Sequence, residues 1–176
     1  TAGATYSSTD AARTVTNLSL QGLRVSQYYS TLTSRLDPSH VAAGSQDQGY
    51  QIASAQAPLL DFRQAISGDY GHLTSGDRTH EWVYSTYPGF ILVQQGEAIP
   101  QLEMLDFPVG SRPQWLPGVE ADPTNREAFY FLADRLWRYE RDGLGRWTSY
   151  LESTTNFFMP LTALSIAPAD PSRRLV

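Results

Sequence analysis

Apolar residues near the start of the chain recur at the period of a helix seam. From Thr9 to Leu36 the intervals between them alternate between four and three residues, as in a heptad repeat. The positions are Ala11, Val15, Leu18, Gly22, Val25, Tyr29, Leu32 and Leu36. Asp37-Pro38 disfavours the helical conformation and ends the pattern. The spacing therefore predicts one long helix over residues 9–36.

The composition of the same stretch argues against a helix. Thr14, Val15 and Thr16 are β-branched and form helices poorly. Gly22 costs a helix about 1 kcal/mol relative to alanine. A helix here would have to be held by packing, and two strands that meet around residues 17–22 are the alternative.

The clearest strand pattern lies in the middle of the chain. His80–Tyr87 is rich in aromatic and β-branched residues, and Pro88-Gly89 after it is a turn signal. Residues 90–95 then read Phe-Ile-Leu-Val-Gln-Gln, so that the two runs predict a hairpin. The continuous apolar run at the start of the second strand predicts that this strand is covered on both faces. A third strand is expected over residues 99–107.

A second helix is predicted over residues 123–141. Asp122 is a good N-cap, and Pro123 suits the first helical position. Acidic residues precede arginines along the stretch, as the helix dipole favours, and Asp142-Gly143 ends it. The apolar positions with helical spacing are Phe129, Leu132, Ala133, Leu136 and Trp137.

A hairpin is the alternative for the end of this stretch. Two aromatic runs, 136–139 and 146–150, flank Asp142-Gly143-Leu144-Gly145, which can form a turn. A hairpin of this kind resembles those of β-rich phage tail and capsid proteins. The resemblance covers about fifteen residues.

The remaining segments are predicted to be connections or short strands. Residues 1–8 read as a flexible arm, 37–58 as a long loop, 108–121 as a proline-rich crossing and 167–176 as a polar tail. Residues 59–66 read as a short helical or extended piece, 67–78 as a turn-rich segment, and 146–151 and 156–166 as closing strands. We find no internal sequence repeat.

These elements predict an α+β fold of one globular domain, residues 9–166. A long N-terminal helix and the helix over 123–141 would pack on a small antiparallel sheet. The alternative is a mainly β sandwich or jelly roll with extended arms.

Composition removes several kinds of chemistry. The 176 residues contain no cysteine and, since all 13 basic residues are arginine, no lysine. Thiolate nucleophiles, disulfides and lysine Schiff bases are therefore excluded. The net charge of −5 opposes a large nucleic-acid footprint and adhesion to anionic lipid. No apolar run approaches the roughly 20 residues that span a bilayer, and the first residues do not read as a signal peptide.

Few residues are candidates for catalysis. His72, His80 and Glu81 lie near Asp69 and Asp77 in the sequence and could serve a metal site or a small hydrolase or isomerase. Their spacing matches no strict motif, and the aspartates are typical turn residues. We therefore expect no catalytic residue, no metal and no cofactor, and the sequence favours a protein that is not an enzyme.

Aromatic and arginine residues are the better candidates for contact with a partner. Trp115 is flanked by prolines and is the tryptophan least suited to a core. Arg138 belongs to a local group of arginines with Arg135, Arg141 and Arg146. Trp147 comes directly after Arg146. Tryptophan and arginine are enriched at the centres of interfaces. The candidate contact residues are therefore Trp115, Arg138 and Trp147.

These observations favour a non-catalytic structural subunit that assembles with copies of itself. The helix seam and the arms would make the contacts, as in a virion capsid or tail component, a shell or a filament. Other structural proteins are possible partners, and the virion or the host cytoplasm would then be its location. The first alternative is a secreted or surface binding module for carbohydrate or protein. The second is a small hydrolase or isomerase that uses His72, His80 and Glu81.

Overall fold

Every regular element in the described part of the chain is a β-strand. The computed structural model describes residues 6–14, 16–17, 27–56, 59–77, 79–96 and 100–176, and within these ranges it contains sixteen strands and no helix. Twelve of the strands form three four-stranded sheets, and the other four form two hairpins.

Each four-stranded sheet is an antiparallel meander of consecutive strands. The first sheet contains β3 (Tyr28–Thr33), β4 (Val41–Ser45), β5 (Gly49–Gln56) and β6 (Leu59–Ile66). The second contains β7 (Gly71–Thr74), β8 (Trp82–Tyr87), β9 (Phe90–Gln95) and β10 (Gln101–Asp106). The third contains β11 (Val119–Ala121), β12 (Ala128–Leu132), β13 (Leu136–Arg141) and β14 (Trp147–Leu151).

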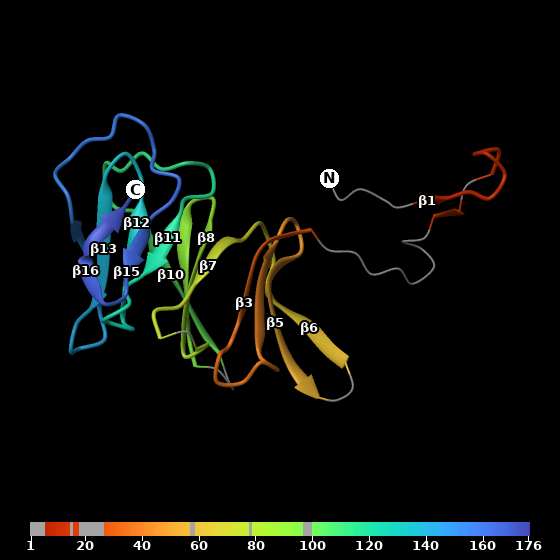
Figure 1. The fold of residues 1–176 in the computed structure, drawn as a ribbon, viewed down its shortest axis with the longest axis horizontal. Helices are drawn as coiled ribbons and strands as arrows, with labels where there is room; N and C mark the ends of the chain where they lie inside the picture. Colours follow the sequence, from red (N-terminus) through yellow and green to blue (C-terminus); the bar gives the residue numbers. More distant parts are fainter. Residues whose placement is uncertain (1–5, 15, 18–26, 57–58, 78, 97–99) are drawn as a thin grey trace.

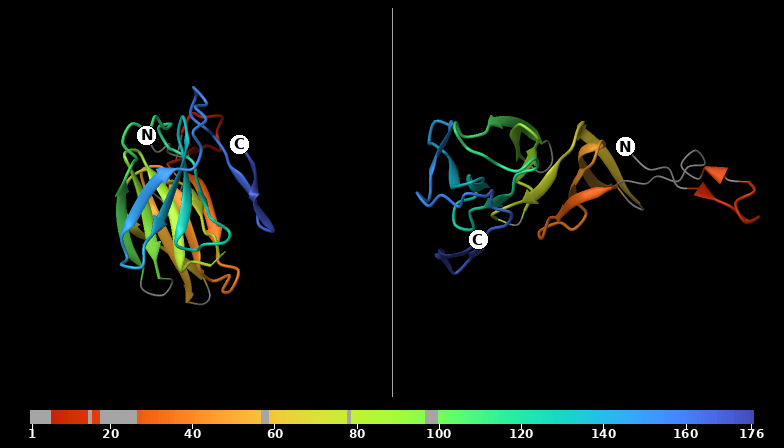
Figure 2. Two further views of the ribbon diagram at one scale, coloured as in Figure 1. Left: turned by 90° about the vertical axis from the view of Figure 1, so that its left-hand side faces the viewer. Right: turned by 90° about the horizontal axis from the view of Figure 1, so that it is seen from above.

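Two short hairpins flank the three sheets. One pairs β1 (Tyr6–Ser7) with β2 (Thr16–Asn17), and the other pairs β15 (Ser165–Ala167) with β16 (Asp170–Leu175). The sheets lie side by side in the order of the sequence, with β1 beyond the first sheet and the β15–β16 hairpin beside the third (Figure 1). The view from above in Figure 2 shows the same order along the long axis of the molecule.

The core consists of layers between neighbouring sheets. Between the first and second sheets, Tyr50 and Ile52 meet Tyr70, Val83 and Leu92. The layer between the second and third sheets is larger and more aromatic. It includes Trp82, Tyr84, Ile91, Val93, Phe129, Phe131 and Tyr139.

Strand β9 shows how the sequence produces these layers. Ile91 and Val93 belong to the layer shared with the third sheet, whereas Leu92 between them belongs to the layer shared with the first. Successive side chains of a strand point to opposite faces, so an uninterrupted apolar run fits a strand with a sheet on each side. The hairpin of residues 80–95, the third strand after it and the covering of both faces are all confirmed.

The predicted long helix over 9–36 is wrong where the structure describes it. Residues 16–17 form β2 and 28–33 form β3, while 18–26 lie outside the described residues. In β3, Leu32 packs against the core, and its neighbours Thr31 and Thr33 are exposed. The β-branched residues adopt the extended conformation that suits them, and alternation decides the burial.

The predicted helix over 123–141 is wrong, and the hairpin alternative is confirmed. Phe129 and Phe131 lie opposite Tyr139 and Trp137 across β12 and β13, and β14 then pairs with β13. Asp122 accepts hydrogen bonds from the backbone nitrogens of nearby residues, as an N-cap would, but the chain turns into a strand. An Asx-turn uses the same side-chain chemistry as a helix cap.

The α+β fold is therefore overturned, and the mainly β sandwich alternative gives the correct class. A jelly roll does not fit, because neighbours in each sheet are consecutive strands rather than partners in Greek keys. The predicted loop over 37–58 contains the whole of β4 and β5, and the predicted polar tail over 167–176 contains β16. Of the predicted strand over 156–166, only the last residues belong to β15.

Candidate functional site

A hollow of about 140 Å³ opens between the second and third sheets. Three neighbouring strands of the second sheet form most of its wall, and β13 of the third sheet closes it. The hollow is lined by Trp82, Val93, Gln95, Gln101, Leu102, Glu103 and Arg141.

Strand register brings the residues of the second sheet together. Trp82 on β8 lies opposite Gln95 on β9, which in turn lies opposite Gln101 on β10. The three residues therefore form one row across the sheet. Glu103 lies two residues along β10, beside Val93, so its side chain points to the same face.

Arg141 supplies the fixed cation of the site. Its guanidinium lies 5.3 Å from the centre of the Trp82 ring, within range of a cation–π contact. Its Nε donates to the carbonyl of Gly145 at 3.2 Å, and Nη1 lies 3.7 Å from a carboxylate oxygen of Glu127. Gly145 has a φ of +80°, and a Cβ there would come within 3.1 Å of the guanidinium. The turn thus holds Arg141 in place and needs glycine to do so.

Trp147 is half-buried and contacts two residues of the hollow without lining it. Its indole nitrogen donates to Glu103 Oε2 at 3.1 Å, which links the third sheet to the second. Its ring meets the Trp82 ring edge to face at a centroid distance of 6.0 Å. Glu103 is exposed, and the hydrogen bond from Trp147 fixes the orientation of its Oε2.

The chemistry of the hollow suits a neutral polar ring. The indole of Trp82 lines the hollow but is only 2% exposed, and the amides of Gln95 and Gln101 can both donate and accept hydrogen bonds. Glu103 accepts and Arg141 donates. The carboxylates of Glu103 and Glu127 outnumber the one guanidinium, so that an anionic ligand would meet net negative charge.

The size of the hollow fits one ring. An engineered cavity of about 150 Å³ accommodates benzene, which gives the scale for a single six-membered ring. The hollow is of that order and opens to solvent, so a ligand could leave substituents or further units outside it.

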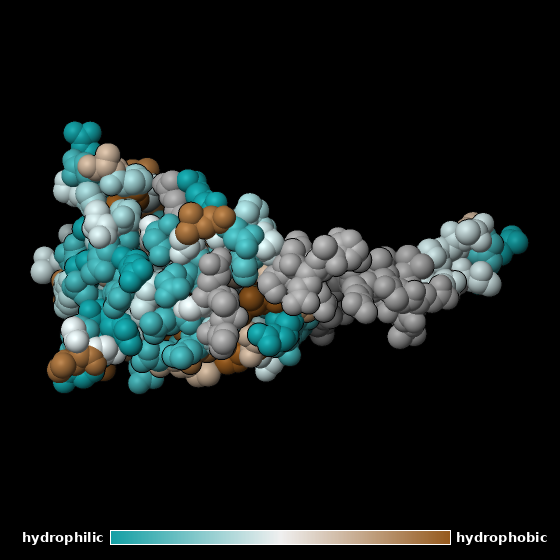
Figure 3. All heavy atoms as spheres, turned by 90° about the horizontal axis from the view of Figure 1, so that it is seen from below, coloured by the Kyte–Doolittle hydropathy of each residue, from teal (hydrophilic) through white to brown (hydrophobic). Residues whose placement is uncertain are grey.

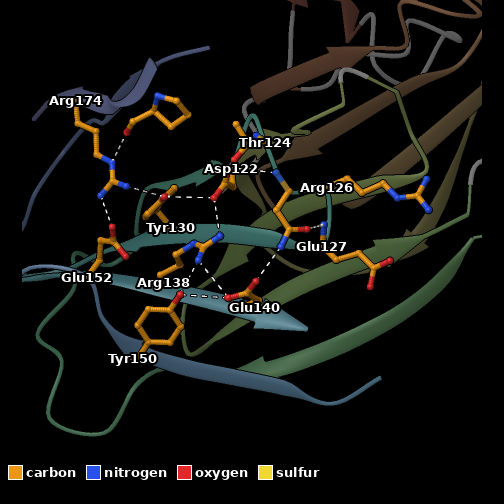
Figure 4. Close-up of polar contacts among 12 residues, drawn as sticks. Asp122, Thr124, Arg126, Glu127, Tyr130, Arg138, Glu140, Tyr150, Glu152 and Arg174 are labelled. Carbon is orange, nitrogen blue, oxygen red and sulfur yellow. Dashed lines mark hydrogen bonds and ion pairs between the residues drawn. The ribbon is translucent and has the colours of Figure 1, made fainter. Parts of the chain in front are cut away.

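A second polar cluster lies on the far face of the third sheet and contains Arg138 (Figure 4). Arg138 Nη2 donates to Asp122 Oδ2 at 2.8 Å, and Nη1 donates to the hydroxyl of Tyr150 at 2.6 Å and to Glu140 at 3.2 Å. Its side chain is only 18% exposed. The predicted contact residue Arg138 is thus occupied by partners of its own sheet.

Ionisation in this cluster follows from its contacts. Burial alone would raise the pKa of Asp122, but hydrogen bonds from Thr124 and Arg138 outweigh it and lower that pKa. Burial would lower the pKa of Arg138, yet its bonds to Tyr150 and Asp122 raise it. Burial raises the pKa of Tyr130 to about 12. The pair therefore stays ionised at neutral pH, and the tyrosine stays protonated.

Trp115, the second predicted contact residue, lies on the segment between β10 and β11 and is 59% exposed. It is not among the residues that line the hollow. Trp147, the third, does not line the hollow either, but it contacts Glu103 and Trp82, which do. The structure therefore places the three candidates in three different settings.

The residues of the enzyme alternative do not form a metal site. Among the residues that the structure describes, no three histidines, aspartates or glutamates gather to hold a metal ion. His72 lies on β7, and buried His80 precedes β8. Asp77 accepts hydrogen bonds from Ser75 and Thr79, which is its expected role in a turn.

The sequence interpretation missed Trp82, Gln95, Gln101 and Arg141 as a group. Each residue taken alone is an ordinary strand residue. The available signal was the predicted hairpin of residues 80–95 and the strand after it, since their register already aligns the first three.

Comparisons with protein-family models, with curated proteins and with solved structures gave no match to this chain. In the part of the chain that the structure describes, no helix could span a membrane. The function is therefore inferred from the site alone.

Proposed function

We propose that the protein is a carbohydrate-binding module and that its site is the hollow between the second and third sheets. The observation that carries this proposal is a hollow of about 140 Å³ in which the edge of the Trp82 indole lies beside side chains that donate and accept hydrogen bonds. The C–H face of a sugar ring is apolar, and its hydroxyls both donate and accept. An indole beside amide, carboxylate and guanidinium groups matches both properties.

The hydropathy of one face of the molecule also supports the binding of a polar ligand. The face drawn in Figure 3 is largely hydrophilic, with hydrophobic residues in separate places rather than in one broad patch. A site of this kind takes a small polar ligand more readily than a large apolar partner. The net charge of −5 further disfavours anionic ligands such as nucleic acid.

Titration with a panel of neutral monosaccharides and short oligosaccharides, followed by calorimetry and tryptophan fluorescence, tests the proposal. At least one sugar should bind and change the emission of Trp82 and Trp147. Arg141→Ala and Gln101→Ala should weaken binding by about 1 to 3 kcal/mol each, or roughly 5- to 150-fold, because each leaves a ligand hydroxyl unpaired.

Matched controls separate the site from general effects on the fold. Arg146→Ala changes an exposed arginine on the neighbouring turn, and Gln114→Ala changes an exposed glutamine outside the hollow. Both variants should bind like the parent protein. The proposal fails if no sugar in the panel binds, or if the control variants lose as much affinity as the site variants.

A further inference from the structure

The strands follow one another along the chain in groups of two, four, four, four and two. The three complete groups are alike: each is a four-stranded antiparallel meander. Their first strands begin at Tyr28, Gly71 and Val119, so the structural unit repeats every 40 to 50 residues, roughly as the blades of propellers do. The two incomplete groups, β1–β2 and β15–β16, together contain the number of strands of one more unit.

The first strands of the units are the ones that meet. Strand β7 contacts β3 and β4 of the sheet before it, and it contacts β11 of the sheet after it. Face-to-face packing of four-stranded meanders through their first strands is the arrangement of β-propeller blades. A series of this kind ends in an uncovered sheet face unless further strands follow at each end.

Hairpin β15–β16 takes the place of the first half of a fourth unit. Ile166 on β15 packs with Tyr130 and Leu132 on the far face of the third sheet. Beside it, Ile166 shares the lining of a small hollow with Glu120 and Ala121 of β11. The first strand of the incomplete unit is thus next to the first strand of the third sheet, as in the complete units.

Arg174 on β16 fixes the hairpin in that place. Its Nη1 donates to Glu152 Oε1 at 2.5 Å, and Nη2 donates to the hydroxyl of Tyr130 at 3.0 Å (Figure 4). The guanidinium also lies 4.7 Å from the centre of the Tyr130 ring. In the described residues β16 pairs only with β15, so its second edge has no strand beside it.

Hairpin β1–β2 takes the place of the second half of such a unit. It comes directly before β3 in the chain, where the third and fourth strands of a preceding unit belong. An isolated two-stranded hairpin is marginally stable in water, and an unpaired strand edge is a template for another strand. Each hairpin therefore lacks two strands of a four-stranded sheet, and the other hairpin can supply them.

We propose that β15–β16 of one molecule and β1–β2 of a second copy combine into a four-stranded sheet. Strand β16 pairs antiparallel with β1 of the other copy, mainly through residues 172–175, because Pro171 has no N–H to donate. Copies join head to tail. The rotation between neighbouring copies determines whether the assembly closes into a ring or continues as a filament.

A second copy fits better than closure within one molecule. The two hairpins lie at opposite ends of the row of sheets (Figure 1). The outer face of the first sheet also carries Tyr28 and Phe62, which are 38% and 36% exposed and whose rings lie 5.9 Å apart. The sheet completed by the neighbouring copy would cover this face, just as each sheet in the chain is covered by the one before it.

Disulfide trapping tests the pairing directly, because the protein has no cysteine of its own. Molecules with Ser7→Cys on β1 are mixed with molecules with Arg173→Cys on β16 and oxidised. A mixed disulfide dimer is expected. Leu144→Cys, on an exposed turn of the third sheet, is the control partner and should give no such dimer with Ser7→Cys.

Analytical ultracentrifugation of the unmodified chain gives the second measurement. The mass should rise with concentration to that of two or more copies, and removal of residues 1–17 should return it to one copy. A single copy at the highest soluble concentration overturns the proposal. A disulfide within one chain of the Ser7→Cys/Arg173→Cys double variant at high dilution also overturns it, since it shows closure within the molecule. Sugar binding is measured separately, so either proposal can fail without the other.

Discussion

Tyr50 donates its hydroxyl to Gln94 Oε1 at 2.5 Å, and this buried bond joins the first sheet to the second. The amide of Gln94 is itself fixed, because its Nε2 donates to the carbonyls of His80 at 3.0 Å and Gly96 at 3.3 Å. Burial raises the pKa of Tyr50 far above its usual value, so the hydroxyl remains a donor at any ordinary pH. A polar bond inside the apolar layer between two sheets sets the register of one sheet on the other.

Tyr50→Phe should therefore cost stability although it removes a single oxygen. The change leaves Gln94 Oε1 buried without a donor, which costs about 1 to 3 kcal/mol. Urea denaturation should show a lower midpoint with an unchanged slope. Tyr28→Phe is the control, since it removes a hydroxyl at 3.1 Å from Gln51 on the outer face of the first sheet. Equal losses in the two variants would contradict the special role of the inter-sheet bond.

At Gly44 on β4 the first sheet approaches the second closely. A Cβ there would lie 2.3 Å from the backbone oxygen of Tyr70 and 2.8 Å from a methyl group of Leu73. Gly44→Ala should force β4 and β7 apart and cost about 1 to 3 kcal/mol, as overpacking does. Gly143→Ala, on a turn where a Cβ meets nothing within 4 Å, should change the urea midpoint little. A tolerated Gly44→Ala would mean that the sheets can shift freely.

The sequence predicted residues 80–107 well and the helical stretches on either side of them wrongly, for a physical reason. Residues 80–107 carry a turn signal between strongly β-forming runs, so local and tertiary preferences agree. Around Asp122, local chemistry is ambiguous, because the same side chain caps a helix or an Asx-turn. Aromatic residues at 129, 131, 137 and 139 fit a strand pair, but neighbours at 132, 133 and 136 also fit a helix. Packing between sheets decided the outcome, and no local pattern encodes it.

The site was predictable only in part. Trp147 was identified from its residue type and contacts Glu103, which lines the hollow. Arg141 was seen only as a member of a group of arginines, because its position over Trp82 depends on the packing of the third sheet on the second. Contacts between strands 40 to 60 residues apart in the chain depend on the tertiary arrangement rather than on sequence spacing.

Acid should destabilise the protein partly through Asp122. Its folded-state pKa is lowered, so its contribution to stability is fully present above the unfolded value near 3.8 and is lost as pH falls through the folded value. Asp122→Asn removes the ionisable group. The free energy of unfolding at neutral pH should therefore be lower than in the parent protein, and it should decrease less between about pH 5 and pH 2. Denaturation midpoints across that range measure it. Gln114→Ala, which changes an exposed residue that does not titrate, should keep the parental slope.

Trp147→Phe should separate the two roles of Trp147 at the proposed sugar site. The phenyl ring retains aromatic contact with Trp82, but the donor that orients Glu103 at 3.1 Å is lost. We expect affinity for the best sugar of the panel to fall by about 1 kcal/mol, or roughly fivefold, and the ligand-dependent change in fluorescence to shrink. Trp115→Phe removes an exposed tryptophan outside the hollow and should alter neither quantity. If Trp115→Phe abolished binding while Trp147→Phe did not, the ligand would belong on the segment between β10 and β11 instead.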